Sequence, residues 1–213
     1  VTDTDWEIQA VEHVDNDGRP DILWRHKPDG YLLVWFMDGL RWLRSQSPPF
    51  GTSPSVATNF QEFALGDFNG DGKPDLVFRD PGGARTTMWL LDGSSITNSV
   101  IIIGETVGWD LVAAADFNAD GRADLLWRNP ATGQLKVWYM NGMSSIGTAS
   151  IAAPGDVNWV VAAARDMNGD GRPDLIWRHA TTGANVLWFM NGVTMTSYGM
   201  MPAVPDPNWV IVK

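Results

Sequence analysis

Short apolar runs alternate with clusters of turn residues along the whole chain. The runs are rich in Val, Ile, Leu and Trp, and Gly, Pro, Asn and Asp stand between them. In one run, strand alternation places Leu125 and Trp127 on one face, with Leu126 and Arg128 on the other. No stretch shows the helical spacing of three to four residues. The pattern predicts an all-β chain of many short strands.

The same series of runs occurs four times. The glycines Gly18, Gly72, Gly121 and Gly171 mark equivalent positions, roughly 50 residues apart. Each repeat contains a loop, a strand of the Leu-x-Trp/Phe-Arg type, a turn, a second tryptophan-containing strand and a last β-prone run. The aromatic residues that open the repeats are Trp6, Phe60, Trp109 and Trp159. Repeats of this kind predict four-stranded blades of a β-propeller.

We therefore predict a single β-propeller domain over residues 1–213. Its four repeats are expected at residues 5–58, 59–107, 108–157 and 158–207, and residues 208–213 begin a fifth repeat or supply a closing strand. Small alanines at 113–115 and 162–164 suit a crowded innermost strand. Tryptophans at repeated positions suit packing between blades, and these are Trp24, Trp35, Trp89, Trp127, Trp138, Trp177 and Trp188.

A nine-residue loop between the first and second strands of each repeat carries the candidate chemistry. Residues 166–174 place side-chain oxygens at loop positions 1, 3, 5 and 9, and position 7 would offer its carbonyl. Ca²⁺ takes about six to eight oxygen ligands, which a tight loop can supply from alternate residues. An ordinary turn explains one such loop more easily than four. The candidate ligands are Asp15, Asp17, Arg19, Asp21, Asp67, Asn69, Asp71, Lys73, Asp75, Asp116, Asn118, Asp120, Arg122, Asp124, Asp166, Asn168, Asp170, Arg172 and Asp174.

The first loop departs from the other three. His13 stands where they have aspartate at position 1, and imidazole nitrogen is a poor ligand for a hard ion. Asp15 replaces asparagine at position 3 and keeps the number of carboxylates at three. We expect up to four structural Ca²⁺ ions, with the first site the weakest. Such loops suit a medium rich in Ca²⁺, so we expect secretion or the cell surface.

The net charge of −10 narrows the range of partners. Twelve of the 25 acidic residues lie in the four loops, so the acidity is mostly that of the predicted metal sites. Acidic faces do not suit nucleic acid, which we exclude as a partner. No apolar stretch approaches the ~20 residues of a membrane span, and we expect no membrane insertion. The absence of cysteine excludes thiolate metal sites and cysteine nucleophiles.

The motif Asp-x-Asn-x-Asp-Gly-x-x-Asp-Leu occurs at residues 67–76, 116–125 and 166–175. Its fourth position is glycine in the first and last of these and alanine in the second. This tandem motif resembles the FG-GAP/VCBS repeats. These repeats are known from integrin α-subunit propellers, bacterial surface proteins and fungal lectins of the Psathyrella velutina type. The resemblance covers essentially the whole chain and implies Ca²⁺ in inter-strand loops on one rim of a propeller. It does not imply one function, because members include lectins, adhesion modules and domains attached to lyases.

Several residues outside the loops are candidates for ligand contact. Trp42 has no tryptophan counterpart in the other repeats, and Pro48 and Pro49 follow it in an irregular inter-repeat segment. The arginine that ends each second strand is expected to pair with a carbonyl or carboxylate, with a sugar contact as the alternative. The residue after this arginine varies, as a ligand-facing position would. The candidate ligand-binding residues are Trp42, Arg25, His26, Arg128, Asn129, Arg178 and His179.

The sequence predicts a non-catalytic, Ca²⁺-binding, lectin-like module that binds carbohydrate. The chain has three histidines, no nucleophile elbow, and no carboxylate pair that its spacing singles out for glycosidase chemistry. A protein-interaction or cell-adhesion module, and an accessory domain of a polysaccharide-degrading enzyme, remain alternatives. The expected partner is a glycan or a surface protein. The incomplete fifth repeat also allows a homodimer that completes an eight-bladed ring.

Overall fold

The computed structural model describes residues 3–15, 17–47, 62–79, 85–93, 95–102, 107–206, 209 and 211. Four expected features lie outside these ranges. They are Phe60, the prolines Pro48 and Pro49, the turn at residues 81–83, and most of the segment 208–213. All statements about the fold concern the described residues.

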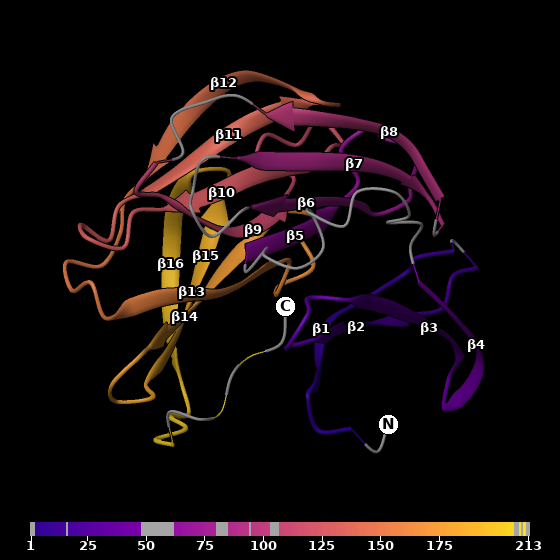
Figure 1. Cartoon of the computed structure of the whole chain (residues 1–213). Helices are drawn as coiled ribbons and strands as arrows, with labels where there is room; N and C mark the ends of the chain where they lie inside the picture. The colour runs from indigo at the N-terminus through magenta and orange to yellow at the C-terminus, as the bar shows by residue number, and fades with distance from the viewer. Residues whose placement is uncertain are drawn as a thin grey trace. The chain divides into compact units, whose positions relative to one another are not determined.

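Four four-stranded sheets make up the described part of the chain (Figure 1). The first contains β1 (Trp6–Glu12), β2 (Asp21–His26), β3 (Leu32–Asp38) and β4 (Arg41–Gln46). The second contains β5 (Glu62–Gly66), β6 (Asp75–Arg79), β7 (Thr86–Asp92) and β8 (Ser95–Ile102). The third contains β9 (Asp110–Ala115), β10 (Asp124–Arg128), β11 (Leu135–Asn141) and β12 (Ser144–Ile151). The fourth contains β13 (Trp159–Arg165), β14 (Asp174–His179), β15 (Asn185–Asn191) and β16 (Thr194–Met201).

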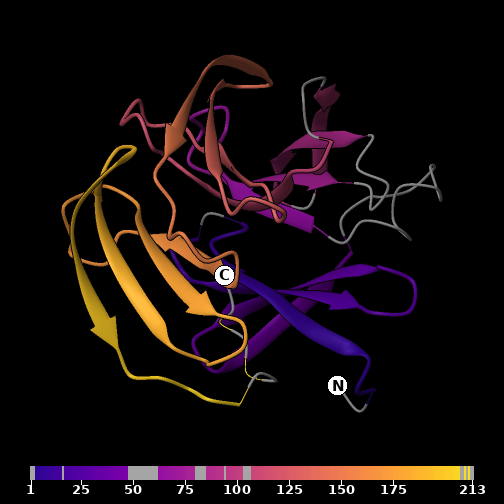
Figure 2. The ribbon, with the colours of Figure 1, turned by 90° about the vertical axis from the view of Figure 1, so that its left-hand side faces the viewer.

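Each sheet is an antiparallel meander whose strands pair in chain order. Figure 2 shows β13 to β16 lying side by side, coloured from orange to yellow. One sheet falls within each expected repeat, and the nine-residue loops join the first and second strands. The predicted all-β propeller fold, with one four-stranded blade per repeat, is confirmed. The described residues include no helix long and apolar enough to span a membrane.

The chain divides into two compact units, Val1–Glu105 and Thr106–Lys213, and each unit holds two sheets. In the first unit, apolar side chains of both sheets meet in one buried core. It includes Leu23 and Phe36 of the first sheet and Phe78 of the second. Removing this apolar surface from water stabilises the packing of the two blades within the unit.

The second unit is built in the same way. Its core joins Leu126 of the third sheet to Leu175 and Trp177 of the fourth. The inner strands β9 and β13 contact each other, and the buried alanines Ala113 and Ala164 lie on them. Small side chains let these two backbones approach closely, which confirms the reason expected for the alanine-rich runs.

Pairs of aromatic rings recur at one position in every sheet. A residue of the second strand packs against a tryptophan of the third, with ring centroids about 5 Å apart, inside the 4.5–7 Å range of favourable aromatic pairs. The pairs are Trp24–Trp35 at 4.8 Å, Phe78–Trp89 at 4.6 Å, Trp127–Trp138 at 5.1 Å and Trp177–Trp188 at 5.0 Å. These four contacts lie within single sheets. The expected packing between sheets is found at Trp89 and Trp177, which belong to the cores that two sheets share.

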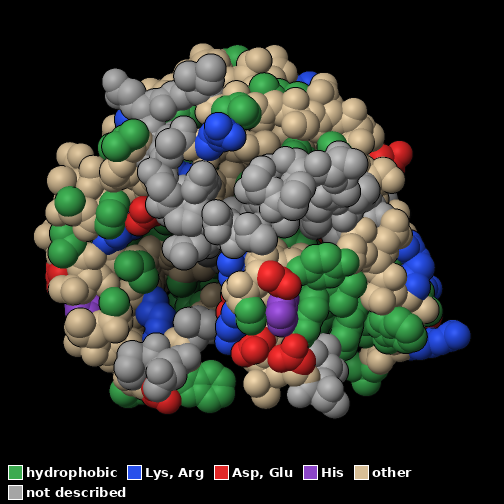
Figure 3. Space-filling view, in the orientation of Figure 1, with side chains coloured by type: hydrophobic (Ala, Val, Ile, Leu, Met, Phe, Trp, Pro, Cys, Tyr) green, Lys and Arg blue, Asp and Glu red, His purple; other side chains and the backbone are tan. Residues whose placement is uncertain are grey.

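Trp42 does not lie in an irregular segment, as the sequence suggested. It belongs to the outer strand β4, where it is the register partner of Met37. The mistake arose because β4 has few β-branched residues and ends beside a proline-rich stretch. Trp42 is 54% exposed, and Leu40 and Leu43 beside it are exposed too. Figure 3 shows hydrophobic side chains gathered over this first sheet.

Candidate functional site

The aspartate at position 1 of the fourth loop is surrounded by backbone N–H groups. Oδ1 of Asp166 accepts hydrogen bonds from the N–H groups of Gly169 at 2.7 Å and Asp170 at 3.2 Å. Its Oδ2 accepts one from Gly171 at 2.8 Å. These hydrogen bonds lower the pKa of Asp166, and the bond from the Gly171 N–H has the largest effect. The loop therefore curls around an ionised carboxylate.

Positions 3 and 5 of the same loop form two consecutive turns closed by their side chains. Oδ1 of Asn168 accepts from the N–H of Asp170 at 2.9 Å, and Oδ1 of Asp170 accepts from the N–H of Arg172 at 2.9 Å. The Asn168 amide nitrogen also donates to Oδ2 of Asp170 at 3.1 Å. Turns of this kind explain why Asn and Asp recur at these positions.

The second and third loops repeat the arrangement nearly bond for bond. Asp67 accepts from Gly70 and Gly72, each at 2.7 Å. Asp116 accepts from Asp120 at 3.1 Å and from Gly121 at 2.8 Å. The side-chain turns at positions 3 and 5 are present in both loops with the same lengths. Three loops thus share one pre-formed set of oxygen atoms.

The fourth side chain of each motif, at position 9, has a different place. We call Asp21, Asp75, Asp124 and Asp174 the loop-end aspartates. They are almost fully buried at the start of the second strand. In the third repeat, Oδ2 accepts from the N–H of Phe117 at 3.0 Å, and Oδ1 accepts from the N–H of Met140 in β11 at 2.8 Å.

The other three loop-end aspartates make the same two bonds. Each carboxylate accepts one hydrogen bond from the N–H at loop position 2. It accepts the other from the N–H of the residue 16 positions after the aspartate, in the third strand. Burial raises the pKa of Asp75 and of Asp124 to about 6, and raises that of Asp21 as well. The sequence identified these residues as metal-ligand candidates but did not show this structural role.

The donor set of the loops fits a hard cation. Positions 1, 3 and 5 carry carboxylate and amide oxygens, and an oxygen that accepts one N–H keeps a second lone pair. Among the described residues, the one group of three acidic or histidine side chains with ligand atoms all within 4.8 Å lies outside these loops. No loop in the described part of the chain brings three carboxylates that close together. A cation held there would draw on amide and carbonyl oxygens as well.

The first loop differs from the other three in its charges as well as in its sequence. Oδ2 of Asp15 forms an ion pair with Arg44 of β4 at 3.2 Å, and His13 is exposed. The side chain at position 7, Arg19, pairs with Asp38 at 3.2 Å. Its equivalent Lys73 pairs in the same way with the residue that ends β7. These basic side chains point away from the loops, as expected if only their carbonyls serve as ligands.

A comparison with models of protein families finds a match that includes all four loops. A model of the FG-GAP-like repeat matches three times, over residues 13–78, 67–127 and 116–177, each span including two successive loops. The chain belongs to the FG-GAP-like repeat family. No curated protein matches the sequence.

Solved structures show a similar fold at low sequence identity. One is a lectin from Agrocybe aegerita, in a structure that describes specific recognition of non-reducing terminal N-acetylglucosamine. It is 16% identical with a TM-score of 0.58, and the alignment covers 97% of this chain and 55% of the lectin chain. Another comes from a nidogen/laminin complex, with 14% identity, a TM-score of 0.51, and coverage of 86% and 60%. The chain therefore spans little more than half the length of these structures.

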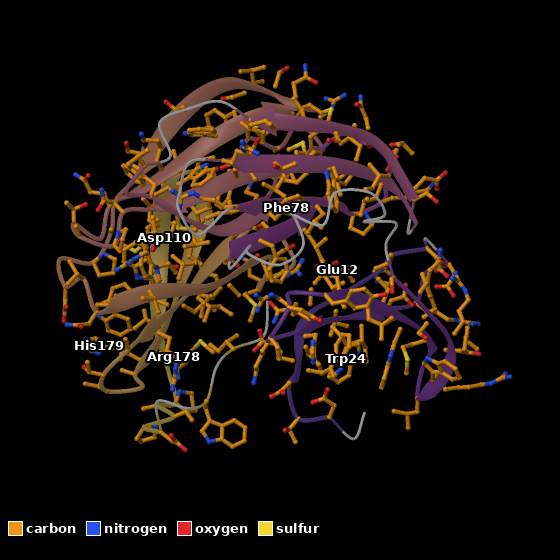
Figure 4. All side chains as sticks on the ribbon, in the orientation of Figure 1. Glu12, Trp24, Phe78, Asp110, Arg178 and His179 are labelled. Carbon is orange, nitrogen blue, oxygen red and sulfur yellow. The ribbon has the colours of Figure 1, made fainter. Side chains whose placement is uncertain are left out.

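The arginine that ends the second strand of each FG-GAP-like repeat has structural partners. Arg178 is 8% exposed and donates to the carbonyls of Gly183 at 3.2 Å, Val204 at 2.8 Å and Asp206 at 3.1 Å. Arg128 donates to the carbonyl of Val157 at 2.5 Å. These bonds tie the second strand to the turn after it and to the segment that follows the fourth strand, and the carbonyl partners agree with the favoured interpretation. Figure 4 shows Arg178 beside His179 at the end of β14.

In the first, third and fourth repeats, the residue after this arginine closes the turn between the second and third strands. Oδ1 of Asn129 accepts from the N–H groups of Ala131 at 2.9 Å and Thr132 at 3.2 Å. His179 contacts Asp156 through Nε2 at 3.0 Å. In these three repeats the arginine and the next residue lie together at the end of the second strand, whereas Trp42 lies on an outer strand. Their role in ligand binding stays a prediction.

The sequence did not reveal a groove in the third FG-GAP-like repeat. It has a volume of about 470 Å³ and is lined by Trp109, Gln134, Lys136 and Ser150, among others. Nζ of Lys136 lies 4.5 Å from the centroid of the Trp109 ring. Trp109 was recognised only as the aromatic residue that opens the repeat, and nothing in its spacing indicated a groove.

Position 4 of the second, third and fourth loops has a left-handed backbone. Gly70 and Gly169 have φ values of 80° and 81°, whereas the third loop has Ala119 there, with φ 60°. A side chain in this conformation costs about 1 kcal/mol or more, and glycine avoids the cost.

We predict that Ala119→Gly raises the free energy of unfolding by about 1 kcal/mol, because the left-handed strain is removed. The matched change Gly169→Ala should lower it by a similar amount, since a Cβ there meets no atom within 4 Å and only the backbone is strained. Denaturant unfolding measures both. A less stable Ala119→Gly protein would contradict the assigned strain.

We also predict that Asp124→Ala lowers the free energy of unfolding by about 2–5 kcal/mol in metal-free buffer. It leaves the N–H groups of Phe117 and Met140 without their acceptor, and a buried unsatisfied donor costs roughly 1–3 kcal/mol. Asp120→Ala is the matched control, because it removes the same charge from the exposed part of the same loop. Equal losses from the two changes would show that the loop-end aspartate has no special structural role.

Proposed function

We propose that this chain is a non-catalytic recognition module whose loops bind Ca²⁺ and whose blades bind carbohydrate. The observation that carries the Ca²⁺ proposal is the shared oxygen set of three loops, built around Asp67, Asp116 and Asp166. Nearly identical networks of this kind in three separate places support selection for one ligand rather than for turn geometry alone. Oxygen donors in a flexible loop suit Ca²⁺ better than softer metals.

The proposed ions are structural. The loops join strands, and binding to the folded state alone stabilises it by mass action. The first loop should bind most weakly, because His13 offers nitrogen and Arg44 already neutralises Asp15 at 3.2 Å. Dependence on Ca²⁺ supports a protein that works outside the cell or on its surface.

The Trp109 groove supports the carbohydrate part of the proposal. An indole next to hydroxyl, amide and ammonium groups offers a stacking surface together with directional hydrogen bonds, and about 470 Å³ lies in the usual range for small-molecule sites. The similar fold of the Agrocybe aegerita lectin makes a sugar the first ligand to test. At 16% identity that likeness concerns the fold alone.

A protein-interaction or adhesion module is the second candidate. The outer strand β4 exposes Trp42 and Leu43, Leu40 is exposed just before it, and clustered apolar side chains on a surface favour a protein partner. An accessory role beside a polysaccharide-degrading enzyme would use the same sugar groove. The backbone N–H of Trp209 donates to the carbonyl of Asp206 at 3.2 Å, as that of Trp159 donates to Asp156 at 3.1 Å at the opening of the fourth repeat. The homodimer stays a prediction, which light scattering tests.

Excess Ca²⁺ should raise the melting temperature relative to protein in chelator, because each ion adds about 2.7 kcal/mol when its concentration is 100 times the Kd. Equilibrium dialysis should find three ions bound before a weaker fourth. Asp170→Asn should remove one of them. Asp92→Asn, which removes an exposed carboxylate outside the loops, should remove none. Equal melting curves with and without Ca²⁺ would show that the loops are ordinary turns that do not bind Ca²⁺.

A glycan array with Ca²⁺ present tests the carbohydrate proposal. We expect Trp109→Ala to weaken the binding of the best glycan about tenfold, because one stacking contact worth about 1.4 kcal/mol is lost. Trp209→Ala, which removes an exposed tryptophan of the same unit that does not line the groove, should leave binding unchanged. A blank array for the unaltered protein would overturn this part of the proposal and favour the adhesion module.

A further inference from the structure

A cluster of mixed nitrogen and oxygen donors lies at the end of the first hairpin that is opposite its loop. It consists of Asp3 and Asp5, just before β1, and His26, at the end of β2. The imidazole and carboxylate ligand atoms all lie within 4.8 Å of one another. We call it the Asp-His cluster. It shares no residue with the nine-residue loops.

The spacing of the cluster suits a small tetrahedral ion. Nε2 of His26 lies 3.3 Å from Oδ2 of Asp3. Zinc bonds of roughly 2.0–2.2 Å to nitrogen and oxygen put the ligand atoms of a tetrahedral site about 3.3–3.6 Å apart. The carboxylate of Asp5 supplies a third donor. Water can fill the remaining position, since both aspartates are exposed.

Asp29 and Trp6 hold the imidazole of His26 in its orientation. Its Nδ1 lies 2.7 Å from Oδ1 of Asp29, and that oxygen also accepts the N–H of Tyr31 at 3.1 Å. The ring of Trp6 packs on the imidazole with centroids 5.0 Å apart. A carboxylate on one ring nitrogen fixes the tautomer and makes the other nitrogen a better metal ligand. Nε2 is therefore the atom presented to the two aspartates.

The aspartates are held in place as well. The N–H of Lys27 donates to the carbonyl of Asp5 at 2.9 Å, which fastens this segment to the turn after His26. The N–H of Asp5 donates to Oδ1 of Asp3 at 2.9 Å, so Oδ2 is the oxygen that faces the imidazole.

The fourth repeat shows the same scaffold with other donors. Asp156 and His179 occupy the places of Asp3 and His26, and Nε2 of His179 contacts Asp156 at 3.0 Å, an ordinary hydrogen-bond length. Asn158 stands where Asp5 does, and Thr182 stands where Asp29 does. The second carboxylate and the orienting carboxylate occur together in the first repeat and are both replaced in the fourth.

We propose that Asp3, Asp5 and His26 bind a divalent transition-metal ion of the Zn²⁺ class. One imidazole nitrogen with two carboxylate oxygens suits Zn²⁺ or Co²⁺, whereas Ca²⁺ prefers oxygen ligands only. Asp29 is a positioning residue, acting through the histidine. The chain thus has a second kind of metal site, selected by the nitrogen donor.

The test is a titration of the whole chain with Co²⁺ and with Zn²⁺, with excess Ca²⁺ present throughout. Visible absorption reports Co²⁺ in a tetrahedral site, and calorimetry reports Zn²⁺. We expect one equivalent per chain. Asp5→Asn, an exposed change that copies the fourth repeat, should weaken Zn²⁺ binding at least tenfold. His26→Ala should abolish the Co²⁺ spectrum.

Two further variants separate the proposal from its rivals. Asp29→Asn should weaken Zn²⁺ binding by about 10–100-fold, the usual effect of losing an orienting partner. His179→Ala, the matched histidine of the fourth repeat, should leave both titrations unchanged. Absence of the tetrahedral Co²⁺ spectrum would overturn the proposal. So would unchanged Zn²⁺ binding by the Asp5→Asn protein, provided that its melting temperature equals that of the unaltered protein. His26 would then be only a hydrogen-bonding partner of Asp3 and Asp29.

Discussion

The loop-end aspartates are the constraint on which each blade depends. One buried carboxylate accepts an N–H from the loop before the second strand and another from the third strand, 16 residues along the chain. Neither donor has water as an alternative partner, so separating the three segments would leave unsatisfied polar groups inside the protein. The start of the second strand, the path of the loop and the end of the third strand are thereby fixed together.

This arrangement also decides what a cation can contribute. Loop positions 1, 3 and 5 lie on the exposed side of the loop-end aspartate, already organised by backbone N–H groups, as in Asp166 and its glycine neighbours. A bound ion would relieve repulsion among carboxylates in a loop whose path is set by other bonds. We therefore expect Ca²⁺ to add stability to a formed blade, unlike metal in small domains that fold only around their ion.

Much of the fold could be predicted because its causes are local and periodic. Alternating apolar positions, a fixed repeat length and turn residues define the strands and the loops without reference to distant partners. The role of Asp124 could not be predicted, because a loop motif does not say that one of its oxygens will meet Met140 of another strand. The strand position of Trp42 was missed for lack of β-branched neighbours, and the Trp109 groove depends on three-dimensional packing that has no sequence pattern.

The repeats serve as controls for one another, and the first departs from the others at both ends of one hairpin. At its loop, Asp15 already has Arg44 as a cation partner. At the opposite end, where Trp6 is the register partner of His26, the first repeat has the carboxylates Asp5 and Asp29 that the fourth lacks. The equivalent residues Trp159 and His179 are register partners in the fourth repeat too, so the two repeats differ here in the side chains that this shared pairing carries. In the first repeat, the donors suited to a divalent ion are more complete at the end with the imidazole than at the loop.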